Sequence, residues 1–182
     1  MQTSTLTDHT SIPRQIAFLL AGVGVLTASS YVAVPMVPVP VTMQTLAVLL
    51  VGAVAGPRMG LAMIVSWLAL AATGLPVLAG GKAGLLAFTG PTAGFLLAFP
   101  AAGFLAGVMT QTLARGHISR ALSFLGLHGL ILMAGWAWLA TLVGAEAAFT
   151  AGVAPFLVGA VIKSALGAAV LAAIPARWRA AR

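Results

Sequence analysis

The chain has no cysteine, and only two of its 182 residues are acidic. Without cysteine, disulfides, thiolate metal sites and cysteine nucleophiles are all excluded. The two acids, Asp8 and Glu146, fall outside the long apolar stretches. An intramembrane protease or a carboxylate-based metal enzyme needs acidic residues inside such stretches. The composition therefore argues against both classes and predicts no metal site.

A source of energy is also missing from the sequence. The nearest approach to a phosphate-binding loop is Gly81-Lys82-Ala83, but Pro76 stands where the earlier glycine should be, and no Ser or Thr follows the lysine. Ion-coupled transporters commonly place acids or histidines in their membrane spans. Here His128 lies inside a predicted span, and we expect it to bond to a neighbouring helix rather than to relay protons.

What the chain has in excess is apolar surface. Hydrophobic residues make up 61% of the sequence and charged residues 6%, and the mean hydropathy is +1.11. This composition suits a lipid-facing surface and not a water-facing one. The net charge of +7 reflects arginines scattered singly at segment ends, which is typical of a topology signal. We therefore predict an integral membrane protein that contacts membrane lipid and binds no nucleic acid.

Six apolar stretches are predicted to cross the membrane as helices. The first is longer than a signal-peptide core and is interpreted as a retained helix. The second and third are shorter than the roughly 20 residues that a helix needs to cross the hydrocarbon core. We expect these two to join through a tight turn at Gly56–Gly60, with flanking residues completing each crossing. The predicted spans are Gln15–Val34, Thr42–Gly56, Met59–Thr73, Thr92–Leu113, Ala121–Val143 and Pro155–Ile174.

The basic residues predict the orientation of these spans. With six spans the two termini share a side, and seven of the nine cations then fall on the cytoplasmic side. The prediction is therefore an all-α membrane protein with both termini inside. Its parts are a short cytoplasmic leader at 1–13, a six-helix membrane domain at 14–176 and a basic cytoplasmic tail at 177–182. The seven cations are Arg14, Arg58, Arg115, Arg120, Arg177, Arg179 and Arg182.

One charge, Lys163, lies midway along the apolar stretch from Pro155 to Ile174. An ammonium at the centre of a membrane helix costs about 2.5–3.5 kcal/mol on insertion scales. A lysine near a helix end can instead extend to the membrane interface. Because Lys163 is far from both ends, we favour a protein-lined cavity that binds a small anionic or strongly polar molecule.

Two irregular stretches on the outer half are predicted to fold over this cavity. Val34–Thr42 carries three prolines and must be extended, yet it is almost wholly apolar, which is typical of backbone that lines a cavity. Gly74–Gly94 contains six glycines and two prolines, so its backbone can approach a ligand closely. Gly90-Pro91-Thr92 should begin the fourth helix, with the proline in its first turn, and the N-terminus of this helix would join Lys82 and Lys163 around a carboxylate. An exposed Lys82 outside the cavity fits the sequence equally well.

A small-residue pattern marks the first predicted helix. Ala17 and Ala21 are four residues apart, so they lie on one face and let another helix approach closely. A binding protein without its own energy source needs a partner, and such a face is one way to dock it. The same face also permits self-association.

An ordered run of motifs covers the chain from about Arg14 to Ile174. It comprises Val39-Pro40-Val41-Thr42-Met43-Gln44-Thr45, Gly56-Pro57-Arg58-x-Gly60, Gly74-Leu75-Pro76-Val77, Ala79-Gly80-Gly81-Lys82, Gly90-Pro91-Thr92-x-Gly94 and Pro155-Phe156-Leu157-x-Gly159-x-x-Ile162-Lys163. Together these motifs resemble the BioY family, the biotin-specific substrate-binding (S) components of energy-coupling factor (ECF) transporters.

The resemblance implies a non-enzymatic S component that captures biotin on the outer side of a bacterial inner membrane. In that family a transmembrane coupling protein and two ABC-type ATPases supply the power, which agrees with the missing nucleotide site. The alanine-rich first helix docks on the coupling protein, and Ala17 and Ala21 match it. No cofactor is implied, because biotin is the transported ligand.

Site residues follow from the matching motifs. The resemblance implies that Gln44, Lys82 and Lys163 make polar contacts with biotin, and that Gly80 and Gly81 give backbone access to it. Which lysine meets the biotin carboxylate is left open.

Two further residues concern the same site. Tyr31, near the outer end of the first helix, is expected either to cap the site or to anchor the helix in the membrane interface. Ala160 stands where the family commonly has an aspartate, three residues before Lys163 and on the same helix face. Losing that acceptor is expected to weaken binding by about 1.5–3 kcal/mol. We expect that biotin still binds and that Ala160→Asp tightens it.

Two alternative functions were weighed. The chain could be an S component for another small carboxylated vitamin or for a biotin precursor such as dethiobiotin. It could instead be a membrane-embedded enzyme acting on a lipid-like substrate, but that needs a cluster of reactive groups facing one cavity. The sequence offers only His128, two lysines, and scattered Ser and Thr. Biotin uptake is therefore favoured.

Overall fold

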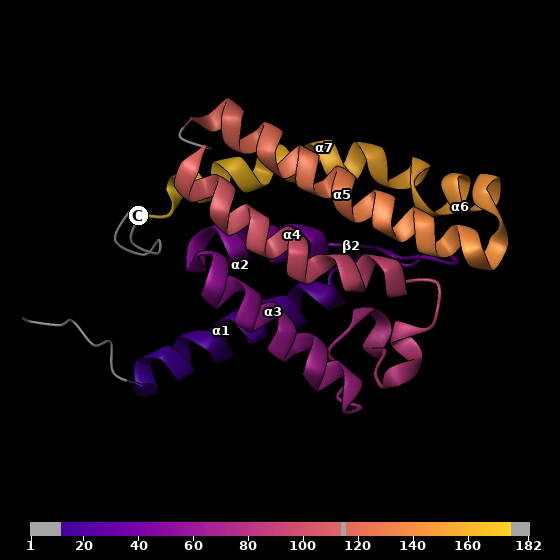
Figure 1. Cartoon of the computed structure of the whole chain (residues 1–182), viewed down its shortest axis with the longest axis horizontal. Helices are drawn as coiled ribbons and strands as arrows, with labels where there is room; N and C mark the ends of the chain where they lie inside the picture. Colours follow the sequence, from indigo (N-terminus) through magenta and orange to yellow (C-terminus); the bar gives the residue numbers. More distant parts are fainter. Residues whose placement is uncertain (1–11, 114–115, 176–182) are drawn as a thin grey trace, which may run out of the picture.

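The computed structural model describes residues 12–113 and 116–175 (Figure 1). Most of the predicted leader and all of the predicted tail lie outside the described residues, together with Arg115. The described chain is helical throughout most of its length, and the all-α part of the prediction is confirmed.

A helix is found at each stretch that was predicted to span the membrane. The helices are α1 (Ile12–Tyr31), α2 (Gln44–Ala55), α3 (Pro57–Ala72), α4 (Ala93–Thr112), α5 (His117–Val143) and α7 (Ala154–Ala173), with an additional short helix α6 (Ala145–Gly152). Within the described residues, α1, α4, α5 and α7 are long and apolar enough to cross a membrane, while α2 and α3 are shorter. The number of crossings and their orientation stay predictions.

Helix α6 was not predicted, because its eight residues are too few to produce a span-length apolar signal. It begins after Gly144, whose φ of 86° ends α5 and reverses the chain. Glycine adopts this left-handed conformation without the steric cost that other residues meet. Helix α6 packs against the bundle through its two buried residues, Ala148 and Gly152.

The predicted tight turn joins α2 to α3. Helix α2 ends at Ala55, Gly56 adopts a φ of 79°, and Pro57 opens α3, where its missing amide hydrogen costs nothing. Gly107 of α4 packs directly on this turn, since a Cβ there would lie 2.5 Å from the nitrogen of Pro57. Glycine at 107 therefore lets α4 lie against both shorter helices.

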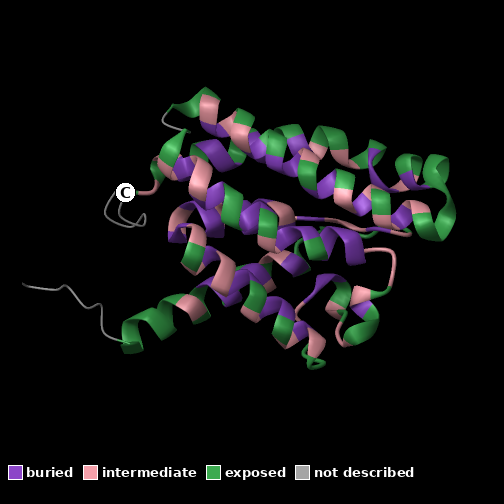
Figure 2. Cartoon of the chain, viewed as in Figure 1, coloured by how far each residue is buried: buried purple, intermediate pink, exposed green. Residues whose placement is uncertain are grey.

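Helix α4 is the centre of the bundle. It packs against α5 on one side and against α2 and α3 on the other, and eleven of its residues are buried. Helix α1 lies at the edge, with its N-terminal half exposed along its length (Figure 2). Its inner face packs on α3, where Gly22 meets the side chain of Met63.

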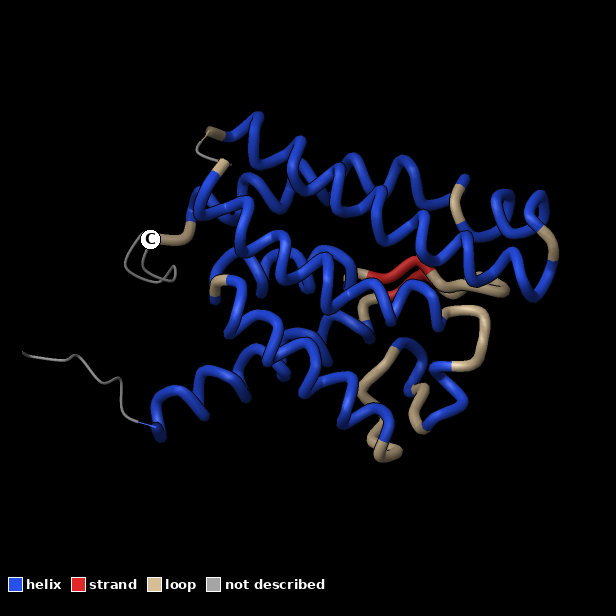
Figure 3. The backbone as a smooth tube through the Cα atoms, viewed as in Figure 1, coloured by secondary structure: helices blue, strands red, loops and turns tan. Residues whose placement is uncertain are grey.

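The proline-rich stretch between α1 and α2 is extended, as predicted. It forms a two-stranded antiparallel hairpin of β1 (Ala33–Val34) and β2 (Val41–Thr42), in which Ala33 pairs with Thr42 (Figure 3). The prediction that the stretch folds inward holds for its second half. Residues 33–37 are exposed, whereas Val39 and Thr42 are buried.

The glycine-rich stretch contains two single-turn helices, η1 (Ala79–Gly81) and η2 (Leu85–Phe88). The indole N–H groups of Trp67 and Trp138 hold it by donating to the carbonyls of Val77 and Gly90, at 3.2 and 3.0 Å. Helix α4 begins at Ala93 with Thr92 as its N-cap, close to the predicted start, but Pro91 lies just before the helix and not in its first turn. The amide of Ala93 instead closes a turn on the carbonyl of Gly90 at 3.1 Å, which leaves Pro91 in that turn.

Candidate ligand-binding site

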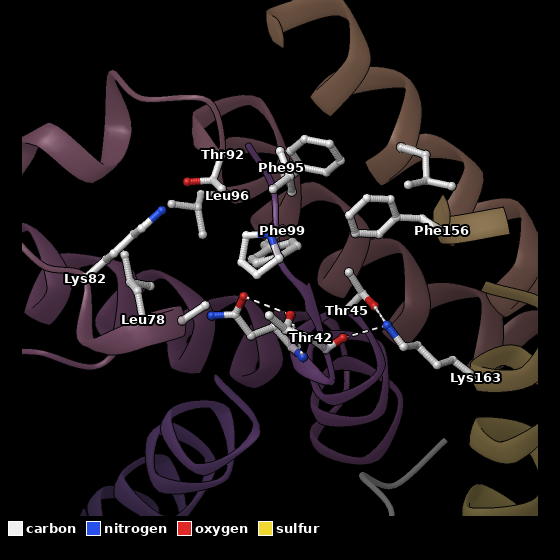
Figure 4. Close-up of a pocket in the computed structure, with 15 residues that line it drawn as sticks. Thr42, Thr45, Leu78, Lys82, Thr92, Phe95, Leu96, Phe99, Phe156 and Lys163 are labelled. Atoms are coloured by element: carbon white, nitrogen blue, oxygen red, sulfur yellow. Dashed lines mark hydrogen bonds between the residues drawn. The ribbon is translucent and has the colours of Figure 1, made fainter. Parts of the chain in front are cut away.

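The hairpin, the single-turn helices and α6 lie at one end of the bundle (Figure 1). A pocket lies between the hairpin, η1 and the helices α2, α4, α5 and α7 (Figure 4). The pocket and its open mouth together contain about 580 Å³ of space. Its wall is mostly apolar and draws on segments from the hairpin to α7. The lining residues are Val39, Pro40, Thr42, Gln44, Thr45, Leu78, Ala79, Lys82, Thr92, Phe95, Leu96, Phe99, Leu132, Phe156 and Lys163.

Lys163 closes the inner end of this pocket. Its side chain is 9% exposed, so it does not extend to the membrane interface. The ammonium donates to the carbonyl oxygen of Thr42 at 2.5 Å and to Oγ1 of Thr45 at 3.4 Å. Within the described residues no carboxylate pairs with it. A buried ammonium without a counter-charge is costly, and an incoming polar group would offset part of that cost.

Gln44 lines the pocket from the first turn of α2, but its amide is already hydrogen-bonded. Its Nε2 donates to Oγ of Ser30 on α1 at 2.9 Å, and its Oε1 accepts from the hydroxyl of Thr42 at 3.1 Å. All three side chains are buried. The network connects α1, β2 and α2, and it positions the Thr42 carbonyl that Lys163 contacts.

Lys82 also lines the pocket, but from its exposed end. Figure 4 shows the two lysines on opposite sides of the pocket, with Phe99 and Leu96 between them. The structure does not bring the two ammonium groups together, and the expectation that both meet one carboxylate beside a helix N-terminus stays a prediction. The sequence could not reveal this, because nothing in it states how η1 folds over α4.

Gly80 and Gly81 lie beside the pocket and not among its lining residues. Both adopt positive φ, 68° and 71°, and this turn places Ala79 on one side and Lys82 on the other against the pocket. Their contribution to the wall is conformational. Direct backbone access to a ligand, which the motif suggested, stays a prediction.

Three phenylalanines of the pocket wall were not identified from the sequence. Phe95 and Phe99 lie four residues apart on α4, and Phe156 of α7 stacks on Phe95 with 6.1 Å between ring centroids. The four-residue spacing was a usable signal, since it puts two rings on one helix face. Together the rings form an apolar part of the pocket wall between the lysines.

Tyr31 lies outside the pocket wall. Its ring is 57% exposed, and its hydroxyl donates to the carbonyl of Pro76. This bond ties the end of α1 to the start of the glycine-rich stretch. Tyr31 therefore holds the cover of the site in place and does not itself line the cavity.

Ala160 and His128 lie together behind Lys163. Ala160 is 6% exposed and His128 3%. The Nδ1 atom of His128 is 3.1 Å from the hydroxyl of Ser164 on α7, as expected for a histidine that bonds to a neighbouring helix. Ala17 and Ala21, by contrast, are exposed on the outer face of α1.

Comparison with known proteins gives a consistent result. Residues 1–180 match the BioY family. The chain is 38% identical to the probable biotin transporter BioY of Pyrococcus horikoshii, over 84% of this chain and 90% of that one. It is 39% identical to the biotin transporter BioY of Rhodobacter capsulatus, over 71% and 77% of the two chains.

A solved structure shares the fold. It is described as the crystal structure at 2.1 Å of the S-component for biotin from an ECF-type ABC transporter. The two structures agree with a TM-score of 0.77 over 89% of this chain and 92% of that chain, at 23% sequence identity.

Proposed function

The chain belongs to the BioY family, and on that premise we propose that it is a membrane protein for biotin uptake, the S component of an ECF-type transporter. The relatives are named as transporters, so its role is transport and not catalysis. The pocket carries the proposal, because its two lysines lie at opposite ends of an apolar cavity. Biotin has the matching layout, with a carboxylate at one end, a ureido group at the other and apolar atoms between them.

The proposed topology is that of an inner-membrane protein with six crossings and both termini in the cytoplasm. Figure 1 supports it, since the α2–α3 turn, the start of α5 and the end of α7 lie at one end of the bundle. The hairpin, the glycine-rich stretch and α6 lie at the other end. The pocket would then open to the outside, where biotin is captured.

The proposed partners are a transmembrane coupling protein and two ABC-type ATPases. Ala17 and Ala21 would contact the coupling protein. Support comes from α1, which lies at the edge of the bundle with its small side chains exposed. An edge helix can meet a partner without disturbing the packing of α4.

Calorimetric titration of the detergent-purified protein with biotin tests this proposal. We expect a dissociation constant between nanomolar and micromolar, and weaker binding of dethiobiotin, which lacks the thioether ring. Thr92→Trp should block binding, because Thr92 lines the pocket near Lys82. Leu97→Trp is the control, since Leu97 is 58% exposed outside the pocket. Absence of biotin binding in the parent chain, or binding unaffected by Thr92→Trp, would contradict the proposal.

A further inference from the structure

A second, smaller cavity adjoins the inner end of the pocket. We call it the side cavity, and it is lined by Thr45, His128, Ile131, Leu132, Phe156, Ala160 and Lys163. Four of these residues, Thr45, Leu132, Phe156 and Lys163, also line the main pocket. A ligand in the main pocket therefore has the side cavity directly next to it.

The hydrogen bonds around His128 determine which ring nitrogen carries the proton. Nδ1 lies 2.9 Å from the carbonyl oxygen of Phe124 and 3.1 Å from Oγ of Ser164. The carbonyl can only accept. The Ser164 hydroxyl donates to the carbonyl of Ala160 at 2.6 Å, so towards the ring it too can only accept. Nδ1 must therefore carry the hydrogen.

Nε2 of His128 is consequently the unprotonated nitrogen of a neutral ring. A protonated ring would place a second buried positive charge beside Lys163, with no carboxylate of the described residues to balance it. Nε2 is buried and has no hydrogen-bond partner within the described part of the chain. Buried polar atoms nearly always have a partner, so an unpaired acceptor on a residue that lines a cavity points to a missing donor.

The other polar groups of the side cavity limit what that donor can be. The Lys163 ammonium has three hydrogens, and its hydrogen bonds to Thr42 and Thr45 leave one for a ligand. Ala160 adds only a methyl group. The cavity thus combines one acceptor, on His128, with one donor, on Lys163. A carboxylate has acceptors alone, so it would leave Nε2 unpaired, whereas an N–H group next to a carbonyl satisfies both.

We infer that the side cavity binds the ureido head of the ligand, with a ureido N–H donating to Nε2 of His128 and the ureido carbonyl accepting from Lys163. The inference rests on the proposed function and adds a specificity-determining residue to it. It also orients the ligand. The carboxylate then lies towards Lys82, where the pocket opens to water.

Binding measurements with two variants and three ligands test the inference. His128→Asn keeps a short amide that can donate to the Phe124 carbonyl, but it places no acceptor in the side cavity. His128→Gln reaches further and restores one. The ligands are biotin and its two derivatives methylated on one or the other ureido nitrogen. We expect His128→Asn to weaken biotin binding roughly tenfold to a hundredfold, and His128→Gln to weaken it less.

The methylated ligands separate this role from a structural one. The derivative that lacks the critical N–H should bind the parent weakly and bind His128→Asn equally weakly. A uniform loss for all three ligands, or no loss for any, would overturn the inference. Should His128→Asn fail to fold, equal affinity of the parent for all three ligands would overturn it as well. If the parent binds biotin and these differences are absent, the proposed function stands alone; if the parent does not bind biotin, both fail.

Discussion

The two ends of the pocket differ in how their lysines are held. Lys163 is buried on α7, and it contacts a backbone carbonyl that the Ser30–Gln44–Thr42 network fixes. Lys82 is exposed on a loop whose shape depends on two glycines with positive φ. A rigid, desolvated donor discriminates between ligand groups, since an unmatched group there stays unpaired. An exposed cation contributes mainly attraction that water and salt weaken.

Removing the buried cation should have the largest effect. Lys163→Met keeps the length and apolar character of the side chain, so the helix should still pack. Losing a hydrogen bond from a charged donor should weaken biotin binding by about 1.5–3 kcal/mol, or roughly tenfold to over a hundredfold by calorimetry. Ile162→Met is the matched control, because Ile162 is adjacent on α7 and 61% exposed. An unchanged affinity in Lys163→Met would show that the Lys163 ammonium does not contribute to biotin binding.

Adding an acid to the side cavity tests whether the buried end of the pocket supplies a hydrogen-bond acceptor to the ligand. Ala160→Asp was expected to tighten biotin binding, and Ala160 and His128 line the same cavity. If His128 already accepts a ureido hydrogen bond, a new carboxylate should help more where that acceptor is missing. We predict a gain of roughly tenfold in the His128→Asn background and only a few-fold in the parent. Equal gains in both backgrounds would mean that the two residues act independently.

Breaking the network behind Lys163 should have an intermediate effect on affinity and a clear effect on stability. Gln44→Leu leaves the hydroxyls of Ser30 and Thr42 without their amide partner in a buried region. Ser30 still donates to the carbonyl of Leu26, whereas the Thr42 hydroxyl loses its acceptor. A buried donor without a partner costs about 1–3 kcal/mol, so the thermal midpoint should fall by several degrees. Biotin affinity should fall a few-fold, because the Thr42 carbonyl loses its support. A scanning-fluorimetry midpoint equal to the parent's would refute this role of Gln44.

Lys82→Ala should have the smallest effect on affinity. An exposed ion pair contributes about 0.2–1 kcal/mol, which corresponds to a loss of roughly 1.4-fold to fivefold. The loss should become smaller when the salt concentration is raised about tenfold, from about 50 to about 500 mM, because the Debye length shortens. Arg58→Ala, at an exposed position in the first turn of α3, removes a cation away from the pocket and should change nothing. A salt-independent loss in Lys82→Ala would indicate a buried contact instead.

Helix positions followed from the sequence because long apolar stretches bounded by glycine, proline and arginine have few other structures available in a membrane. The burial of Lys163 followed too, since an ammonium at that depth needs protein around it. The arrangement of the pocket did not. Gln44 was predicted as a ligand contact from its motif, yet its amide bonds to Ser30, fourteen residues earlier in the chain. Such pairings depend on how helices pack, which composition does not encode.

His128 shows the same limit from the other side. The sequence predicted a bond to a neighbouring helix, and Ser164 provides it. Which ring nitrogen is unprotonated depends on where the Ser164 hydroxyl donates, and only the packed structure reveals that. Short elements such as α6, and the turn that contains Pro91, depend on local capping bonds that leave little trace in hydropathy.

The most direct test of the difference between the two ends is to compare biotin with biotinamide, in which a neutral amide replaces the carboxylate. Calorimetric affinities of both ligands would be measured for the parent and for Lys82→Ala. If the carboxylate lies at the exposed end, biotinamide should bind the parent roughly 1.4-fold to fivefold more weakly than biotin, and this difference should vanish in Lys82→Ala. A difference that persists undiminished in Lys82→Ala would place the carboxylate at Lys163 and contradict the orientation proposed for the ligand.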